Sequence, residues 1–183
     1  EQAQALETEI EQLEGEAKLA KQRELANLFI GGGRLDRAAL VQQEIAEVQS
    51  TPEEWKRAGD LFYDWMSTLQ DQAKPPVAQQ AIAAYQRVLE VQPDNHDVRT
   101  DMATAYLSSN NPMQGVQEIK QVLDADPNHL HARFNYGIML ALIGRGDQAT
   151  EQFEAVKSLV GPESSYYQQA EEAIQSLQQR GSL

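Results

Sequence analysis

The chain has 183 residues, of which 41% are hydrophobic and 23% charged, and its formal net charge is -13. This composition excludes a disordered chain, and no apolar stretch approaches the ~20 residues that a membrane-spanning helix needs. The acidic excess disfavours nucleic acid and anionic membrane surfaces as partners, and the lack of cysteine excludes disulfides, thiolate metal sites and cysteine nucleophiles.

Residues 1–18 are predicted to form a lead helix. Its apolar residues alternate spacings of three and four, which is a short heptad seam: Ala3, Leu6, Ile10, Leu13, Ala17 and Ala20. Two interpretations stay open. The helix continues into the next element and packs on it, or the seam forms a homodimer or a rod from an upstream membrane anchor.

Residues 19–51 are predicted to form a first, degenerate helix pair. Ala26 and Ala38 are small residues that allow two helices to approach closely, and Gly31–Gly33 predicts the turn between them. The same glycines do not form a phosphate-binding loop, because no Lys-Ser/Thr follows them and no strand precedes them.

Residues 52–95 are predicted to form a second pair that is about ten residues longer than those that follow it. The first helix carries Trp55, Gly59 and Phe62, and the second carries Ala81, Tyr85 and Val88 before Pro93. Lys74-Pro75-Pro76 indicates a break, so we expect a lengthened first helix and a longer loop.

Residues 96–129 and 130–162 repeat the same pattern at a spacing of 34 residues. Small residues share one column and large apolar residues share the next two: Ala81, Gly115 and Ala149; Tyr85, Ile119 and Phe153; Val88, Val122 and Val156. The first helices align Ala103 with Gly137. In the second helix of each unit, the small residue precedes a large one by one helical turn on the same face. The recurrence of this pair predicts a repeated two-helix unit.

The ends of the repeats carry helix-stop and helix-start residues. Pro93 and Pro127 close two of the units, and Asp94-Asn95 and Asn128 are predicted to cap the helices that follow. Residues 163–183 are predicted to form a capping helix and tail, with one apolar face: Tyr167, Ala170, Ile174 and Leu177.

This spacing resembles the tetratricopeptide repeat, whose pattern is Trp, Leu-Gly, Tyr, Ala, Phe, Ala and Pro over 34 residues. The resemblance implies an all-α, right-handed α-solenoid of helix–turn–helix repeats that binds other proteins. The architecture also resembles, in general terms, the membrane-tethered extracytoplasmic repeat domains of bacteria, including those of cytochrome c maturation. Localisation therefore stays open between the cytoplasm and the extracytoplasmic space, with an anchor upstream of residue 1.

In that family, the first helix of each unit lines a concave groove that holds a peptide. The resemblance places thirteen residues of this chain in the groove: Lys56, Asp60, Tyr63, Asp97, Thr100, Asp101, Thr104, Ser108, His131, Phe134, Asn135, Ile138 and Leu142. For each residue the alternative is an ordinary solvated helix face, and for Phe134 and Ile138 it is a core contact with the capping helix.

The predicted groove is acidic in its middle and apolar at its end, which favours a basic or amphipathic peptide. One subclass of the family grips a C-terminal carboxylate with lysine, arginine and asparagine. Here Lys56 fits that pattern, but Asp60 and Asp101 replace asparagines and Asp97 stands where a cation is needed. Three carboxylates would repel an acidic tail.

No residue grouping predicts catalysis, a metal or a cofactor. His129 and His131 diverge at a helix start and lack a third ligand at suitable spacing, so they do not predict a zinc site. We therefore predict a non-catalytic protein-binding scaffold or assembly factor. The alternative is a structural protein that self-assembles, as a homodimer or larger, through the heptad helix or the repeat surface.

Overall fold

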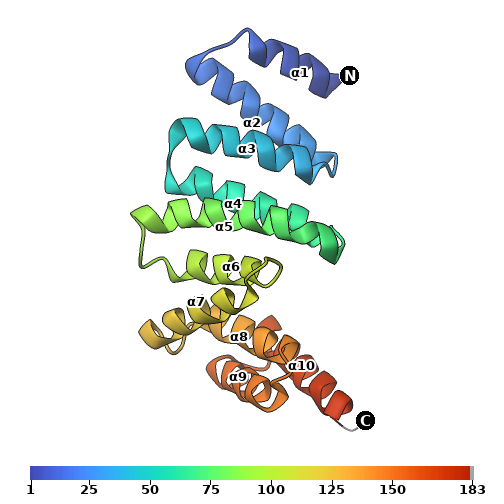
Figure 1. Ribbon diagram of the computed structural model, residues 1–183, viewed down its shortest axis with the longest axis vertical. Helices are drawn as coiled ribbons and strands as arrows, with labels where there is room; N and C mark the ends of the chain where they lie inside the picture. The colour runs from blue at the N-terminus through green and yellow to red at the C-terminus, as the bar shows by residue number, and fades with distance from the viewer. Residues whose placement is uncertain (182–183) are drawn as a thin grey trace. The chain divides into compact units, whose positions relative to one another are not determined.

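The computed structural model describes residues 1–181, and that part of the chain is helical without a β-strand. The chain divides into two compact units, residues 1–98 with 108–110, and residues 99–107 with those from 111 onward. Figure 1 labels the helices: α1 (Gln2–Glu11), α2 (Gly15–Gly31), α3 (Leu35–Gln49), α4 (Pro52–Ser67), α5 (Lys74–Val91), α6 (His96–Tyr106), α7 (Pro112–Ala125), α8 (Leu130–Leu142), α9 (Gly146–Leu159) and α10 (Ser165–Gly181). The prediction of an all-α fold is confirmed.

The lead helix does not continue into the first repeat. It ends at Glu11, and α2 starts at Gly15, which has a positive φ of 57°. Leu6 is buried, and Glu7 accepts a hydrogen bond from Arg37 of α3 at 2.7 Å, so α1 folds back on its own unit. The predicted continuous seam is therefore wrong, because its last two alanines lie exposed on a different helix.

The first helix pair, α2 and α3, is joined by the glycine turn that the sequence predicts. Gly33 has a positive φ of 69°, a conformation that favours glycine, and Arg34 N donates back to Phe29 O at 2.8 Å. Ala26 and Ala38 are both fully buried, so the small residues lie in the core as expected.

The second pair, α4 and α5, lacks the long loop that the sequence predicts. Thr51 caps α4 by accepting a hydrogen bond from Glu54 N, and α4 is long, at 16 residues. The link to α5 is only residues 68–73, with a 3₁₀ turn at Asp71–Ala73. Lys74-Pro75-Pro76 forms the first turn of α5, where proline needs no hydrogen-bond partner for its nitrogen. The extra residues lengthen both helices.

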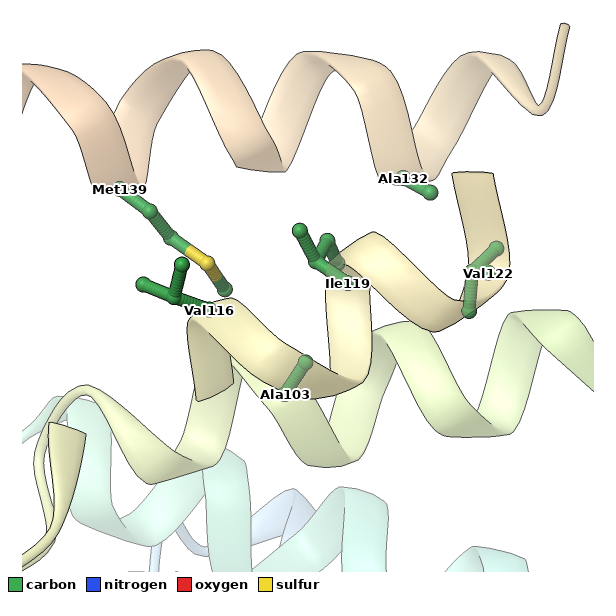
Figure 2. Packing of buried hydrophobic residues seen from close by; sticks show 6 residues of the cluster. All are labelled: Ala103, Val116, Ile119, Val122, Ala132 and Met139. Carbon is green, nitrogen blue, oxygen red and sulfur yellow. The ribbon is translucent and has the colours of Figure 1, made fainter. Parts of the chain in front are cut away.

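In the second unit, one apolar cluster joins three helices. Figure 2 shows Met139 and Ala132 of α8 above Val116, Ile119 and Val122 of α7, with Ala103 of α6 on the other side of α7; all six are buried. A Cβ at Gly115 would collide with the backbone oxygen of Ala103, which explains the small residue in this column. The packing therefore follows the columns of the repeat.

The helix caps agree with the sequence at one site and differ at the other. Asn95 Oδ1 accepts a hydrogen bond from Val98 N at 3.1 Å, as predicted. Asn128 does not cap α8; His129 does, with its Nδ1 accepting from Ala132 N at 3.2 Å. The imidazole therefore takes the place usually held by a hydroxyl or carboxylate oxygen.

The last helix, α10, covers the end of the α8–α9 pair. Ala170 and Ile174 are buried, and Tyr166 and Leu177 pack against the same cluster, which includes Phe153. Tyr167 lies instead under Lys157 of α9, with Nζ 5.2 Å from the ring centroid. The predicted capping helix is present, and its apolar face is shifted to include Tyr166.

Candidate functional site

The α4 face, comprising Lys56, Asp60, Tyr63 and Asp64, carries three of the predicted groove residues, Lys56, Asp60 and Tyr63. Lys56 Nζ donates to both oxygens of Asp60, at 2.8 and 3.0 Å. The Tyr85 hydroxyl of α5 donates to Asp60 Oδ1 at 3.0 Å. Because Asp60 is held from two sides, this face has fixed geometry although its side chains are partly exposed.

Asp64 was missed as a site residue, although it follows Asp60 by one helical turn. Burial raises the pKa of the Asp64 carboxyl, and the negative charge of Asp60 raises it further. The smaller of these two causes is the repulsion between the Asp60 and Asp64 carboxylates when both are charged. A cationic group placed between them would relieve that repulsion.

The predicted residues of α6, together with Ser108 just after it, divide between the two units. Thr100 is fully buried and cannot contact a ligand, so its place in the predicted groove is wrong. Thr104 Oγ1 donates to Thr100 O at 2.9 Å, which satisfies its hydroxyl within the helix. Asp97 is exposed and Ser108 half-buried, and both belong to the first unit rather than the second.

The α8 face, comprising His131, Asn135, Ile138 and Leu142, lies in the second unit. His131 Nδ1 is 4.0 Å from Asp101 Oδ1, so the structure brings together two predicted residues from α8 and α6. Ile138 is partly buried against the α10 cluster, whereas Leu142, one turn further, is 69% exposed. An apolar strip therefore starts in the core and emerges on the surface.

Phe134 is partly buried and packs against the core cluster of the last helices. Its ring centroid lies 5.6 Å from that of Phe153 and 5.4 Å from that of Tyr166, both in edge-to-face arrangements. The alternative interpretation, a contact with the capping helix, therefore describes Phe134. Ile138 packs on the same cluster.

A surface depression in the first unit had no counterpart among the predicted sites. It consists of two adjoining cavities of about 200 and 370 Å³, and Glu47 of α3, Trp55 of α4 and Arg87 of α5 line both. We call it the α3–α5 hollow. The first cavity adds Gln43 and Ala84, and the second adds Glu90 and Val91.

Sequence reasoning had assigned Trp55 to the repeat pattern alone. Trp55 packs against Ala46, Ala58 and Ala84, which are all buried, yet part of its ring stays accessible. The small residues of the neighbouring helices leave the space open. No sequence signal places Glu47 and Trp55 in the lining of one cavity, because that depends on how α3 packs beside α4.

The described residues offer no grouping of three or more histidine, aspartate or glutamate side chains that would hold a metal ion. Among residues 1–181, no helix combines the length and apolarity needed to cross a membrane. His129 is occupied as a helix cap and His131 lies beside Asp101.

Comparison with known proteins supports the repeat assignment. The family described as tetratricopeptide repeat matches residues 100–161. No curated protein sequence matches the chain significantly.

Solved structures with a similar fold include several of MamA. A MamA RS-1 double mutant has 14% sequence identity and a TM-score of 0.62, covering 86% of this chain and 82% of its own. A second MamA crystal structure has 14% identity and a TM-score of 0.61, covering 86% and 85%. MamA MSR-1 has 20% identity and a TM-score of 0.58, covering 90% and 88%. These similarities show the fold, and they confirm the predicted α-solenoid of helical repeats.

Proposed function

We propose that this chain, whose residues 100–161 match the tetratricopeptide-repeat family, is a non-catalytic scaffold that binds a peptide or protein segment. Binding takes place on the first helices of the repeats, and the α4 face of the first unit and the α8 face of the second unit are each a separate candidate surface. The observation that carries the proposal is Leu142, which is 69% exposed at the end of a strip whose other members are partly buried. Ile143, the next residue, is also exposed, at 39%, and adjoining exposed apolar residues favour an interaction surface.

The charges of the two faces favour a partner of defined chemistry. Asp60 and Asp64 lie one turn apart on the α4 face, and Asp101 lies beside His131 at the α8 face. An acidic tail would be repelled at both places, whereas a basic or amphipathic segment would be attracted. Its apolar residue would contact Leu142.

The self-assembly alternative loses one of its two supports. The heptad helix is interrupted at residues 12–14, and its central leucine, Leu6, is buried within the same chain. A dimer through a continuous N-terminal seam would need α1 to detach and re-form with α2 as one helix. Self-association therefore depends on the repeat surface alone.

The test is affinity capture by the folded protein, with recovered partners measured by quantitative mass spectrometry. Leu142→Ser removes the apolar end of the α8 face and should reduce partner recovery about tenfold or more, as loss of a binding hot spot does. Met113→Ser is the matched control, because Met113 is also a large exposed apolar residue, at 50%, but lies on α7. Equal recovery by both folded variants would refute the assignment.

A further inference from the structure

The α3–α5 hollow is lined by an aromatic ring with a cation already on it. The guanidinium carbon of Arg87 lies 5.7 Å from the centroid of the Trp55 ring, within the range of a cation–π interaction. Arg87 Nη1 also donates to Glu90 Oε2 at 3.2 Å. The Trp55 ring and the Glu90 carboxylate therefore both interact with a cation in the protein itself.

The other carboxylate of the lining, that of Glu47 on α3, has no such cation. Glu47 Oε1 accepts a hydrogen bond from the Gln43 amide at 3.0 Å, and Glu47 forms no ion pair with any described residue. The lining thus holds two carboxylates and one guanidinium. The surrounding unit is also acidic, with 18 acidic and 9 basic residues in 1–98 and 108–110, a net charge of 9 - 18 = -9. The uncompensated charge favours a cationic ligand.

The hollow also presents apolar surface beside these charges. Val91, which lines the second cavity, is 65% exposed. Ala83 and Ala84 of α5 line the same cavity as Glu47, and their short side chains leave room for a ligand. A ligand that fills the hollow must therefore pair a cation with an apolar side chain.

We propose that the α3–α5 hollow is a second docking site, separate from the α4 and α8 faces, for a partner segment with an arginine or lysine next to a large apolar residue. The cation lies between Glu47 and Glu90, and the apolar side chain lies on Trp55 and Val91. Its charged residues come from the second helices α3 and α5, its tryptophan comes from α4, and the site does not depend on Leu142.

The probe is a capped, fluorescently labelled ten-residue peptide of alternating arginine and leucine, and its binding is followed by fluorescence anisotropy. Glu47→Lys and Glu90→Lys should each weaken binding about tenfold or more, because each reverses a charge beside the cation. Arg87→Gln should tighten it about threefold or more, because it removes the competing cation. Glu11→Lys on α1 is the matched control for net charge and should have little effect.

A second measurement reports the site directly. The chain has two tryptophans, and in a Trp65→Phe variant the emission comes from Trp55 alone. The probe should shift or quench this emission, and a peptide with glutamate in place of arginine should not. Circular dichroism of each variant checks that it is folded.

The outcomes separate this site from the α8 face. Loss of probe binding in the Glu47 and Glu90 variants, with normal binding by Leu142→Ser, supports the docking site. Loss in Leu142→Ser alone overturns it and leaves the proposed function in place. Failure of the wild-type protein to bind the probe, or equal weakening by Glu11→Lys, also overturns it.

Discussion

The ring of Tyr85 lies against Gly59 so closely that a Cβ on Gly59 would be 2.6 Å from Tyr85 Cε1. Phe153 meets Gly137 in the same way, at 2.7 Å. The first pair is 26 residues apart in the chain and the second 16. The same contact therefore survives a ten-residue insertion, because the added residues extend α4 and α5 beyond it.

Gly137→Ala should destabilise the protein, because the new methyl group meets a fully buried ring that has no free space to enter. We expect a net loss of about 1–2 kcal/mol in urea unfolding, after the gain in helix propensity from alanine. Gly31→Ala is the control, since nothing lies within 4 Å of its Cβ position. A stabilised Gly137→Ala variant would contradict the packing.

Glu54 should make the stability of the protein fall at acidic pH. Burial raises its pKa, but hydrogen bonds from Arg23 at 2.9 Å and Gln42 at 2.6 Å outweigh burial, and the pKa lies below its ordinary value near 4.5. A carboxylate whose pKa is lowered in the native state stabilises the protein at pH values above its ordinary pKa. This stabilisation is lost as the pH falls through the native pKa.

Glu54→Gln should therefore lower the free energy of unfolding by about 1–3 kcal/mol near neutral pH. On acidification, the free energy of unfolding should fall less for this variant than for the wild type. Urea unfolding at about pH 7 and pH 3.5 measures both. Parallel pH profiles of the two proteins would show that Glu54 is not responsible.

Asp64 should have the opposite effect. Its pKa is raised by burial and by Asp60, so the charged form costs stability at neutral pH and the cost disappears as pH falls through the raised pKa. Asp64→Asn should raise the thermal midpoint near pH 7, and the advantage should shrink in acid. Asp124→Asn on α7, an exposed position, is the control and should leave the midpoint unchanged. A lower midpoint for Asp64→Asn would contradict the repulsion with Asp60.

Leu6→Ala should release α1 from the first unit without changing the oligomeric state. Leu6 is 6% exposed, and its burial within the chain holds the terminal helix in place. Hydrogen exchange should show α1 amides losing protection about tenfold, while light scattering gives the wild-type mass. Gln4→Ala, an exposed neighbour, should preserve protection. A fall in mass for Leu6→Ala would instead support the N-terminal seam as a dimer interface.

The repeat was predictable because its signal is local and recurs: Ala81, Gly115 and Ala149 each precede a large apolar residue by one turn. The helix starts were harder to predict, because Pro75 and Pro76 indicate a break between helices but are tolerated in the first turn of a helix. The site was predicted least well. Burial of Thr100 and opening of the hollow over Trp55 depend on contacts between helices, which helical periodicity does not specify.

Site-specific photo-crosslinking tests the central claim most directly. A photoreactive amino acid placed at position 142 of the α8 face, and separately at position 113 of α7, reports which surface contacts the partner in a mixture that contains it. We predict that adducts of the same partner form from position 142 and are at least tenfold weaker from position 113. Adducts from position 113 with none from position 142 would contradict binding through the first helices.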